Sequence, residues 1–385
     1  MKPRERLLAA LSHEEADRVP IDIGTPVTSI HRQAYDRLKR HLGLPDSPAA
    51  IIDNMQQVVD VEEEVLQRFG ADTRQLFLKP ARPWRKNGRA ESGGSEDLFA
   101  DEWGIRYRAS AGGRYFDMVG HPLAEADIED LDAYDWPDPE SPTRFEGLEE
   151  RARHLREQTG CGVVLSGFGE ALFGLPSWLR GHVRFYMDFI QDPDFLEALL
   201  DRMLDYALRL VRGALSAAGR YIDVVRISDD LGSEKGLIVS PEHYRRFIKP
   251  RQERLYRAVK ELSDARLLLH SCGAVSELIG DFIEIGVDAL NPVQVSAAGM
   301  DTAALKRTYG DYIAFWGGGC DTQHVLPFGT VADVTEEVKR RIADLAPGGG
   351  FVFAPVHNIQ YDVSAEKIAA LYDAALDFGR YPVEA

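Results

Sequence analysis

Short apolar segments that alternate with amphipathic stretches constrain the fold of this chain more than any other feature. Each has the length and the β-branched or aromatic content of a buried strand. Helical patterns separate most of them, and strands that alternate with helices predict a parallel sheet. We count eight predicted strands, the number that closes a (β/α)8 barrel. They are residues 18–24, 72–78, 162–166, 222–227, 265–270, 287–291, 312–316 and 350–354.

The intervening segments complete the prediction of an α/β fold. Residues 80–120 are rich in Arg, Gly and aromatic side chains, which is typical of an inserted hairpin, and we expect them to form a lid. The acidic, proline-rich run 125–143 predicts a surface connection. We expect a TIM barrel with an N-terminal helical extension, in a single domain over 1–385; an open doubly wound sheet shares the same alternation and is the alternative. Helical spacing predicts helices over 3–13, through about residue 42, and over 51–69, 193–218, 241–261 and 331–344.

Charge and composition argue against several classes of protein. The chain has 45 basic and 62 acidic residues and a net charge of −17, which disfavours a nucleic-acid or anionic-membrane surface. The N-terminal segment is too charged for a signal peptide, and no run reaches the ~18 apolar residues that span a bilayer. The three cysteines lack the spacing of a disulfide framework, so we expect a cytoplasmic protein whose reduced thiols are free to bind metal.

The segment Ala265–Cys272 places two metal-capable side chains at the end of a predicted strand. Its sequence, ARLLLHSC, ends in His270 and Cys272, and residues two apart in extended backbone point to the same side. An imidazole and a thiol that converge on one point supply two of the three protein ligands of a catalytic zinc site. The same short pattern is also typical of a buried histidine and a small apolar cysteine that only pack.

Further polar residues follow the other predicted strands, where the active site of a (β/α)8 barrel gathers. Position alone predicts either Cys320 or His357 as the third metal ligand. Glu170 follows a glycine-bracketed turn after the third strand, which suits a displaceable ligand or a base. Asp229 and Asp230 are adjacent, so in extended backbone only one of them can face the pocket.

The remaining strand ends supply candidates for cofactor contacts. The Gly317–Gly319 run lets a ligand approach the backbone closely, but it lacks the spacing of a nucleotide-binding loop. Cys161 precedes its predicted strand, so we expect it at the opposite, structural end of the barrel. The residues expected to bind a cofactor are Asn291, Gln294, Gly318, Asp321 and Gln323, with His324 and Gln323 at the mouth.

Several longer segments together resemble the uroporphyrinogen decarboxylase superfamily. The resemblance covers nearly the whole predicted barrel and implies the (β/α)8 fold that the strand pattern also predicts. The segments are DRVPIDIG (17–24), SGFGEALFG (166–174), ISDDLGSEKGLIVSPEHYRRFIKPR (227–251), HSCG (270–273), WGGGCDTQHVLPFGT (316–330) and FAPVHNIQYDVSAEKIAALYDA (353–374).

That superfamily contains two kinds of enzyme, and the motifs of this chain resemble one more than the other. The true decarboxylases carry a paired-arginine motif where this chain has IDIGTPVTSIH, and an Asp that FLKPARPW does not show. The corrinoid-dependent methyltransferases carry an H-x-C pair and a later Cys that bind zinc. HSC matches the pair, and Pro355-Val-His357 stands at the place of the later Cys. The resemblance therefore favours His357 as the third ligand, with Cys320 as the second choice.

The resemblance implies a zinc-dependent methyltransferase. Such an enzyme moves a methyl group between a small substrate (methyl ether, amine or thiol) and a corrinoid, methylcobalamin, on a partner protein. Glu170, Asp230 and His357 are then the expected catalytic residues, beside the metal ligands His270 and Cys272. Two alternatives stay open: a metal-free decarboxylase of a carboxylated ring compound, and a non-catalytic barrel that binds a tetrapyrrole or corrinoid. The sequence also leaves open whether the chain forms a homodimer.

Overall fold

A parallel sheet of seven strands lies at the centre of the computed structural model, which describes residues 1–89, 97–110 and 112–383. Its strand order is β13-β12-β11-β10-β9-β8-β3, so strands that follow one another in the chain are neighbours in the sheet. This order contradicts the doubly wound alternative. The strands are β3 (Thr73–Phe77), β8 (Gly162–Ser166), β9 (Val224–Ser228), β10 (Arg266–His270), β11 (Ala289–Asn291), β12 (Ala314–Trp316) and β13 (Phe351–Val352).

The segment around Ile21 joins the two edges of this sheet. Ile21 forms a parallel bridge with Phe353, and the N–H of Asp22 donates to the Phe353 carbonyl at 2.8 Å. On its other side, the N–H of Asp72, next to the start of β3, donates to the Ile21 carbonyl at 2.7 Å. The sheet therefore curls into a TIM-barrel-like ring, in which this segment takes the place of the first predicted strand.

One helix closes the N-terminal end of the barrel. α1 (Pro3–Leu11) packs Leu7, Ala10 and Leu11 into a separate buried cluster with apolar side chains from the strands. The strand residues of that cluster are Val164, Val224, Leu268, Ala289, Ala314, Trp316 and Val352. This packing fills the interior of the barrel at its N-terminal end.

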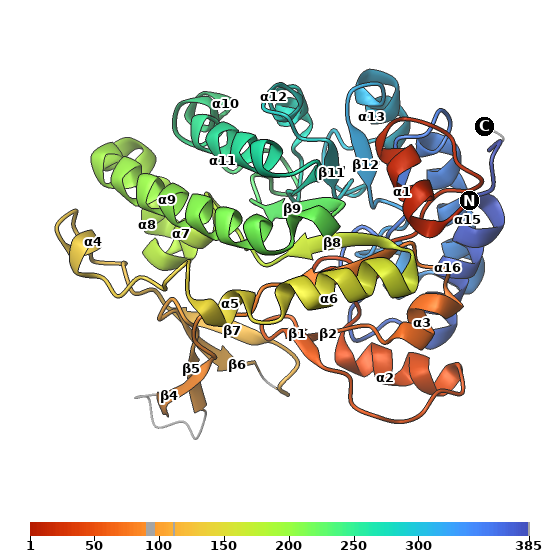
Figure 1. Ribbon diagram of the computed structural model, residues 1–385, viewed down its shortest axis with the longest axis horizontal. Helices are drawn as coiled ribbons and strands as arrows, with labels where there is room; N and C mark the ends of the chain where they lie inside the picture. The colour runs from red at the N-terminus through yellow and green to blue at the C-terminus, as the bar shows by residue number, and fades with distance from the viewer. Residues whose placement is uncertain (90–96, 111, 384–385) are drawn as a thin grey trace.

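The other helices cover the outside of the barrel, and both termini lie on the same side of the molecule (Figure 1). The predicted helices at 193–218 and 331–344 are confirmed, while the one at 241–261 is divided by a π-helical turn at Tyr244–Ile248. Within the described residues, no helix combines the length and the apolar character needed to cross a membrane. The covering helices include α2 (Arg32–His41), α6 (Leu148–His154), α7 (Gly174–Arg180), α8 (His182–Gln191), α9 (Pro193–Ala218), α10 (Pro241–His243), α11 (Lys249–Leu262), α12 (Ile279–Glu284), α13 (Thr302–Tyr309), α15 (Val331–Leu345) and α16 (Ala365–Phe378).

The predicted helix at 51–69 is wrong in its first half. The chain forms a small antiparallel pair, β1 (Ile51–Asp53) and β2 (Val58–Val59), and only α3 (Glu63–Arg68) is helical. The Asp53 carboxylate accepts the N–H groups of Met55 and Gln56 at 2.7 and 3.1 Å, which turns the chain between the two strands. The valines that suggested helical spacing here belong in part to a buried strand.

Residues 80–120 form the expected insertion, apart from 90–96 and 111, which lie outside the described residues. β4 (Arg85–Arg89), β5 (Asp97–Ala100), β6 (Arg106–Ala109) and β7 (Phe116–Gly120) form an antiparallel sheet in that order. This sheet projects from one side of the barrel (Figure 1). Trp84 stacks on Tyr107, with 4.5 Å between the ring centroids, and meets Phe116 edge-on. The connection at 125–143 carries α4 (Asp130–Ala133) and the start of α5 (Pro142–Phe145).

Candidate metal centre and the cavity beside it

Three metal-capable side chains meet at the carboxyl end of the barrel strands. His270 is the last residue of β10, Cys272 follows two residues later, and His357 lies in the loop after β13. One ligand atom of each lies within 4.8 Å of those of the other two, and the Cys272 Sγ is 3.4 Å from His270 Nε2. In the part of the chain that the structure describes, no other group of three or more His, Cys, Asp or Glu side chains has this spacing.

Asn291 fixes the orientation and the tautomer of His270. It ends β11 directly opposite His270 in the sheet register and is fully buried. Its Nδ2 donates to the Trp316 carbonyl at 2.8 Å, and because a carbonyl only accepts, the amide oxygen must face His270. His270 Nδ1 lies 2.5 Å from this oxygen and therefore carries the proton. Nε2 is therefore unprotonated, and its lone pair, which faces the Cys272 thiol, can bind a metal ion.

Burial keeps both imidazoles neutral. Burial, with a smaller effect of the Arg226 charge, lowers the pKa of His270 to about 3. Burial and the neighbouring His270 lower the pKa of His357 to about 4. Burial, followed by Asp230 and Glu170, raises the pKa of the Cys272 thiol well above its usual value. The imidazoles are therefore in the form that binds a metal, whereas the thiol must lose a proton on binding.

Two neighbouring loops hold Cys272 in place. Its N–H donates to Asp230 Oδ1 at 2.8 Å, and the N–H of Gly273 donates to Gln294 Oε1 at 2.7 Å. Gly273 has a φ of +89°, and a Cβ atom there would lie 2.3 Å from the carbonyl carbon of Gly232. Glycine is therefore needed where the loops after β9 and β10 cross.

Only Asp230 of the two adjacent aspartates faces the cavity. Asp229 is fully buried, and its Oδ1 accepts the N–H groups of Leu172 and Phe173 at 2.8 and 2.6 Å. Glu170 accepts the N–H of Asp230 at 3.0 Å through Oε2. Burial, followed by the charge of Asp230, raises the pKa of Glu170 well above its usual value. Burial therefore favours the protonated form of Glu170, which can donate a proton into the cavity.

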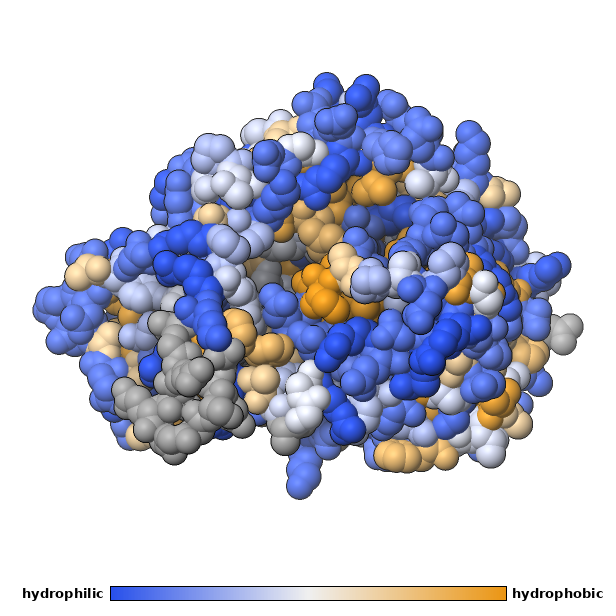
Figure 2. All heavy atoms as spheres, turned by 90° about the horizontal axis from the view of Figure 1, so that it is seen from below, coloured by the Kyte–Doolittle hydropathy of each residue, from blue (hydrophilic) through white to orange (hydrophobic). Residues whose placement is uncertain are grey.

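The centre opens on a cavity of about 580 Å³ at the barrel mouth. His270, His357, Glu170 and Asp230 contribute polar groups to its lining. Figure 2 shows a hollowed face of the molecule with hydrophobic side chains inside the hollow. Apolar and aromatic side chains share this lining with many polar and charged groups, and a cavity that offers both kinds of contact suits a small organic ligand. Its apolar and aromatic lining includes Phe77, Leu78, Trp103, Phe168, Trp178 and Tyr206.

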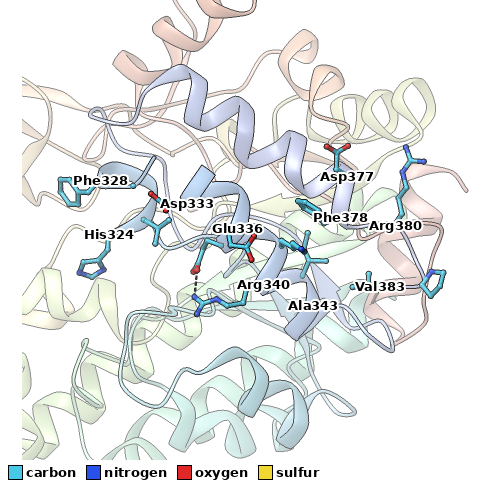
Figure 3. Close-up of a pocket in the computed structure, with 16 residues that line it drawn as sticks. His324, Phe328, Asp333, Glu336, Arg340, Ala343, Asp377, Phe378, Arg380 and Val383 are labelled. Atoms are coloured by element: carbon cyan, nitrogen blue, oxygen red, sulfur yellow. Dashed lines mark hydrogen bonds and ion pairs between the residues drawn. The ribbon is translucent and has the colours of Figure 1, made fainter. Parts of the chain in front are cut away.

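A larger groove, of about 1220 Å³, lies elsewhere on the surface. It runs between α14 (Val325–Phe328), α15 and the end of α16, where Asp333, Arg340 and Phe378 line it (Figure 3). None of the three metal-capable side chains borders this groove. Chemistry rather than size therefore identifies the cavity beside His270 as the candidate site.

Cys320 lies apart from the three clustered side chains. It is fully buried, and its Sγ is 3.9 Å from the carbonyl of Asp321. Burial, followed by the charge of Glu337, raises the pKa of this thiol. Cys161 is buried at the start of β8, where its Sγ is 3.7 Å from the Ala71 carbonyl. The structure thus brings the favoured His357, and neither of these thiols, to His270 and Cys272.

None of the five residues predicted to bind a cofactor lines the cavity. Asn291 and Gln294 support His270 and Gly273, as described above. Gly318 has a φ of +82°, and a Cβ there would lie 2.7 Å from the Val293 side chain. Their contact with a cofactor stays a prediction. The other two lie in the loop after β12: Asp321 accepts N–H groups from Gln323 and His324, and Gln323 bonds to Ser296 and Glu234. His324, predicted at the mouth with Gln323, lines the larger groove instead.

Our reading of the sequence missed Arg226, which also lines the cavity. Arg226 lies in the middle of β9, with 5% of its surface exposed. Its Nε donates to Ser166 Oγ at 3.2 Å and its Nη1 to Ser228 Oγ at 2.6 Å. The sequence did contain a signal for it. Arg226 is a charged residue inside the apolar strand IDVVRIS, and it lies on the same strand face as Ser228, two positions later at the end of the strand.

The fold and the site define a class: a TIM-barrel-like protein with a His-Cys-His centre at the carboxyl ends of its strands. Residues 110–378 match the family described as uroporphyrinogen decarboxylase (URO-D), and the chain belongs to this family. It is 25% identical to the uroporphyrinogen decarboxylase of Thioalkalivibrio sulfidiphilus, over 96% of both chains. It is 24% identical to that of Alkalilimnicola ehrlichii, over 96% of this chain and 93% of the relative.

A solved structure shares the fold of the whole chain. It is described as a methyltransferase from Methanosarcina mazei, and the likeness covers 98% of this chain and 99% of that one. The TM-score is 0.64 and the sequence identity is 22%. The comparison confirms the predicted TIM-barrel-like fold.

Proposed function

We propose that this chain is a zinc-dependent methyltransferase, folded as one domain over residues 1–385. It moves a methyl group between a small methyl ether, amine or thiol and a corrinoid carried by a separate protein. The observation that carries the proposal is the cluster of His270, Cys272 and His357, whose ligand atoms lie within 4.8 Å of one another at the barrel mouth. The fold shared with a methyltransferase gives further support.

The donor set fits zinc. One thiolate and two neutral imidazoles are ligands that zinc takes in proteins, and three protein ligands leave one position for a substrate. Asn291 supplies the hydrogen bond that a metal-binding histidine makes through its other ring nitrogen. When bound, zinc acts as a Lewis acid that lowers the pKa of a thiol or polarises the atom that carries the methyl group.

Glu170 and Asp230 provide the remaining polar groups. Because Glu170 Oε2 accepts the Asp230 N–H, Oε1 is left to carry the proton. This acid can protonate the oxygen or nitrogen that loses the methyl group. Asp230 lies 3.6 Å from His270 Nε2 and can hold a polar group of the substrate beside the metal ligands.

Metal analysis and a methyl-transfer assay test the proposal. Purified protein should contain about one zinc ion per chain, and His270→Ala and Cys272→Ala should lose it. Cys161→Ala, which removes a buried thiol at the other end of the barrel, should keep it. The zinc protein should also demethylate methylcobalamin with thiol acceptors, or methylate cob(I)alamin from methyl ethers or amines. The proposal would be refuted if purified wild-type protein contained no zinc and gave the same results in the methyl-transfer assay as the His270→Ala and Cys272→Ala variants.

The names of the curated relatives favour a second candidate, decarboxylation of a carboxylated ring compound. His357 and Asp230 would then act as acid–base groups without a metal. Release of carbon dioxide from a carboxylated tetrapyrrole by metal-free protein, undiminished in Cys272→Ala, would establish this candidate. A spectral shift of added corrinoid without turnover would instead indicate a non-catalytic binding protein.

A further inference from the structure

Arg226 is a buried cation that the chemistry described above does not use. It lines the cavity from β9, and 5% of its surface is exposed. The hydroxyl groups of Ser166 and Ser228 accept hydrogen bonds from Nε and Nη1, so the plane of the guanidinium group is fixed. The third nitrogen, Nη2, has no acceptor among the described residues. The side chain is therefore held in place, and the N–H groups of Nη2 are available to a ligand.

No carboxylate among the described residues forms an ion pair with Arg226. Four carboxyl groups lie near enough for their charges to act on it: Glu170, Asp22, Asp230 and Asp53. Burial raises the pKa of Glu170, Asp22 and Asp53, which favours their neutral forms. A buried guanidinium group without a close counterion is unfavourable, and an anion that enters the cavity would relieve this.

A second guanidinium group in the cavity lining is also incompletely bonded. Among the described residues, Arg151 donates only to backbone carbonyls, those of Phe77 at 3.2 Å and Gly147 at 3.4 Å. Its Nη2 is buried and has no hydrogen-bond partner in the described part of the chain. Unused donors from β9 and from α6 thus border one cavity. Its lining also contains apolar and aromatic side chains, such as Phe168 and Trp178, and further charged groups, such as Lys79, Glu102 and Asp230.

We propose that Arg226 binds a carboxylate group of the substrate, so that the substrate is a small molecule with a flat apolar body and one negative charge. The carboxylate would accept hydrogen bonds from Nη2 of Arg226, while the apolar body packs against side chains such as Phe168 and Trp178. The inference rests on the proposed function only in taking the bound molecule to be the methyl substrate. Recognition of the anion itself depends on Arg226 and the cavity.

Calorimetry with matched acids and amides tests the inference on the purified protein, measured as isolated and after incubation with zinc. The probes are benzoate and phenylacetate, each compared with its neutral amide. Wild type should bind at least one acid about ten times more tightly than the amide, because a charge-assisted bond to a buried Arg is stronger than a neutral one. Arg226→Met should reduce this preference to about twofold or less, and Arg226→Lys should retain part of it.

Arg341→Met is the matched control, because Arg341 is equally buried but pairs with Glu337 on α15, outside the cavity. It should leave the preference unchanged. Wild type that binds neither acid, or binds acid and amide equally, would overturn the inference even if Arg226→Met failed to fold. An unchanged preference in Arg226→Met would overturn it as well. If the preference is present and depends on Arg226 but zinc or methyl transfer is absent, the proposed function fails while the anion site stands.

Discussion

Replacing Asn291 by Ala should weaken zinc binding and destabilise the fold, through two broken hydrogen bonds. The Asn291 amide joins His270 Nδ1, at 2.5 Å, to the Trp316 carbonyl, at 2.8 Å, in a fully buried site. Without it, both groups are left without partners, at about 1–3 kcal/mol each, so the free energy of unfolding should fall by about 2–6 kcal/mol. The ring of His270 also becomes free to hold its proton on Nε2. Loss of such an orienting bond typically lowers metal affinity about 10–100-fold, or about 1.4–2.7 kcal/mol.

Two measurements separate these effects. Zinc affinity is measured by competition with a chromophoric chelator, and stability by urea unfolding of the metal-free protein. Gln252→Ala is the control, because Gln252 is an equally buried amide that bonds to Asp229 and Tyr244, at 2.9 Å each, instead of to a metal ligand. It should lose stability and keep its zinc affinity. Wild-type zinc affinity in a folded Asn291→Ala variant would refute the claim that Asn291 orients His270.

Two further predictions concern Cys272. Zinc affinity should rise about tenfold per pH unit between about pH 6 and 8, because the raised pKa of the Cys272 thiol means that binding releases one proton. The imidazoles, with pKa values of about 3 and about 4, are already neutral in this pH range and release no proton on binding. Chelator competition measures the change in zinc affinity with pH. No change, or a change near a hundredfold per pH unit, would contradict the release of one proton from Cys272. Gly273→Ala should lower stability by about 2–4 kcal/mol and reduce zinc affinity, since its Cβ would collide with Gly232 and displace Cys272. Gly236→Ala, whose Cβ meets nothing within 4 Å, should change neither urea unfolding nor zinc affinity, and equal effects of both variants would count against the close contact.

The strands and the pair of metal ligands were predictable because their signals are local. Apolar runs such as Arg266–His270 lie in a parallel sheet that is buried on both faces, so they appear in the sequence as nearly continuous hydrophobic segments. The carboxyl ends of parallel strands meet on one side of a barrel, which places His270 and Cys272 at its mouth. The helix predicted from Ile51 failed because the Asp53 turn, a contact between a side chain and the backbone, overrode the spacing of the valines.

The rest of the site depends on contacts across strands that sequence patterns do not reveal. Asn291 was predicted as a cofactor contact, but the register of β10 and β11 sets it opposite His270, where it orients the ring. Whether His357 or Cys320 approaches Cys272 depends on the path of two loops after different strands. Arg226 gave a visible signal inside an apolar strand, yet only the structure shows that it borders the cavity and forms no ion pair with any described residue.

X-ray absorption at the zinc edge tests the central claim most directly. The His-Cys-His centre predicts one sulfur ligand at about 2.3 Å and two histidine nitrogens at about 2.0–2.1 Å, with the remaining position held by a light atom. The sulfur signal should vanish in Cys272→Ser and persist in Cys320→Ser. Two sulfur ligands, or a sulfur signal that depends on Cys320, would contradict the assignment, as would purified protein that binds no zinc.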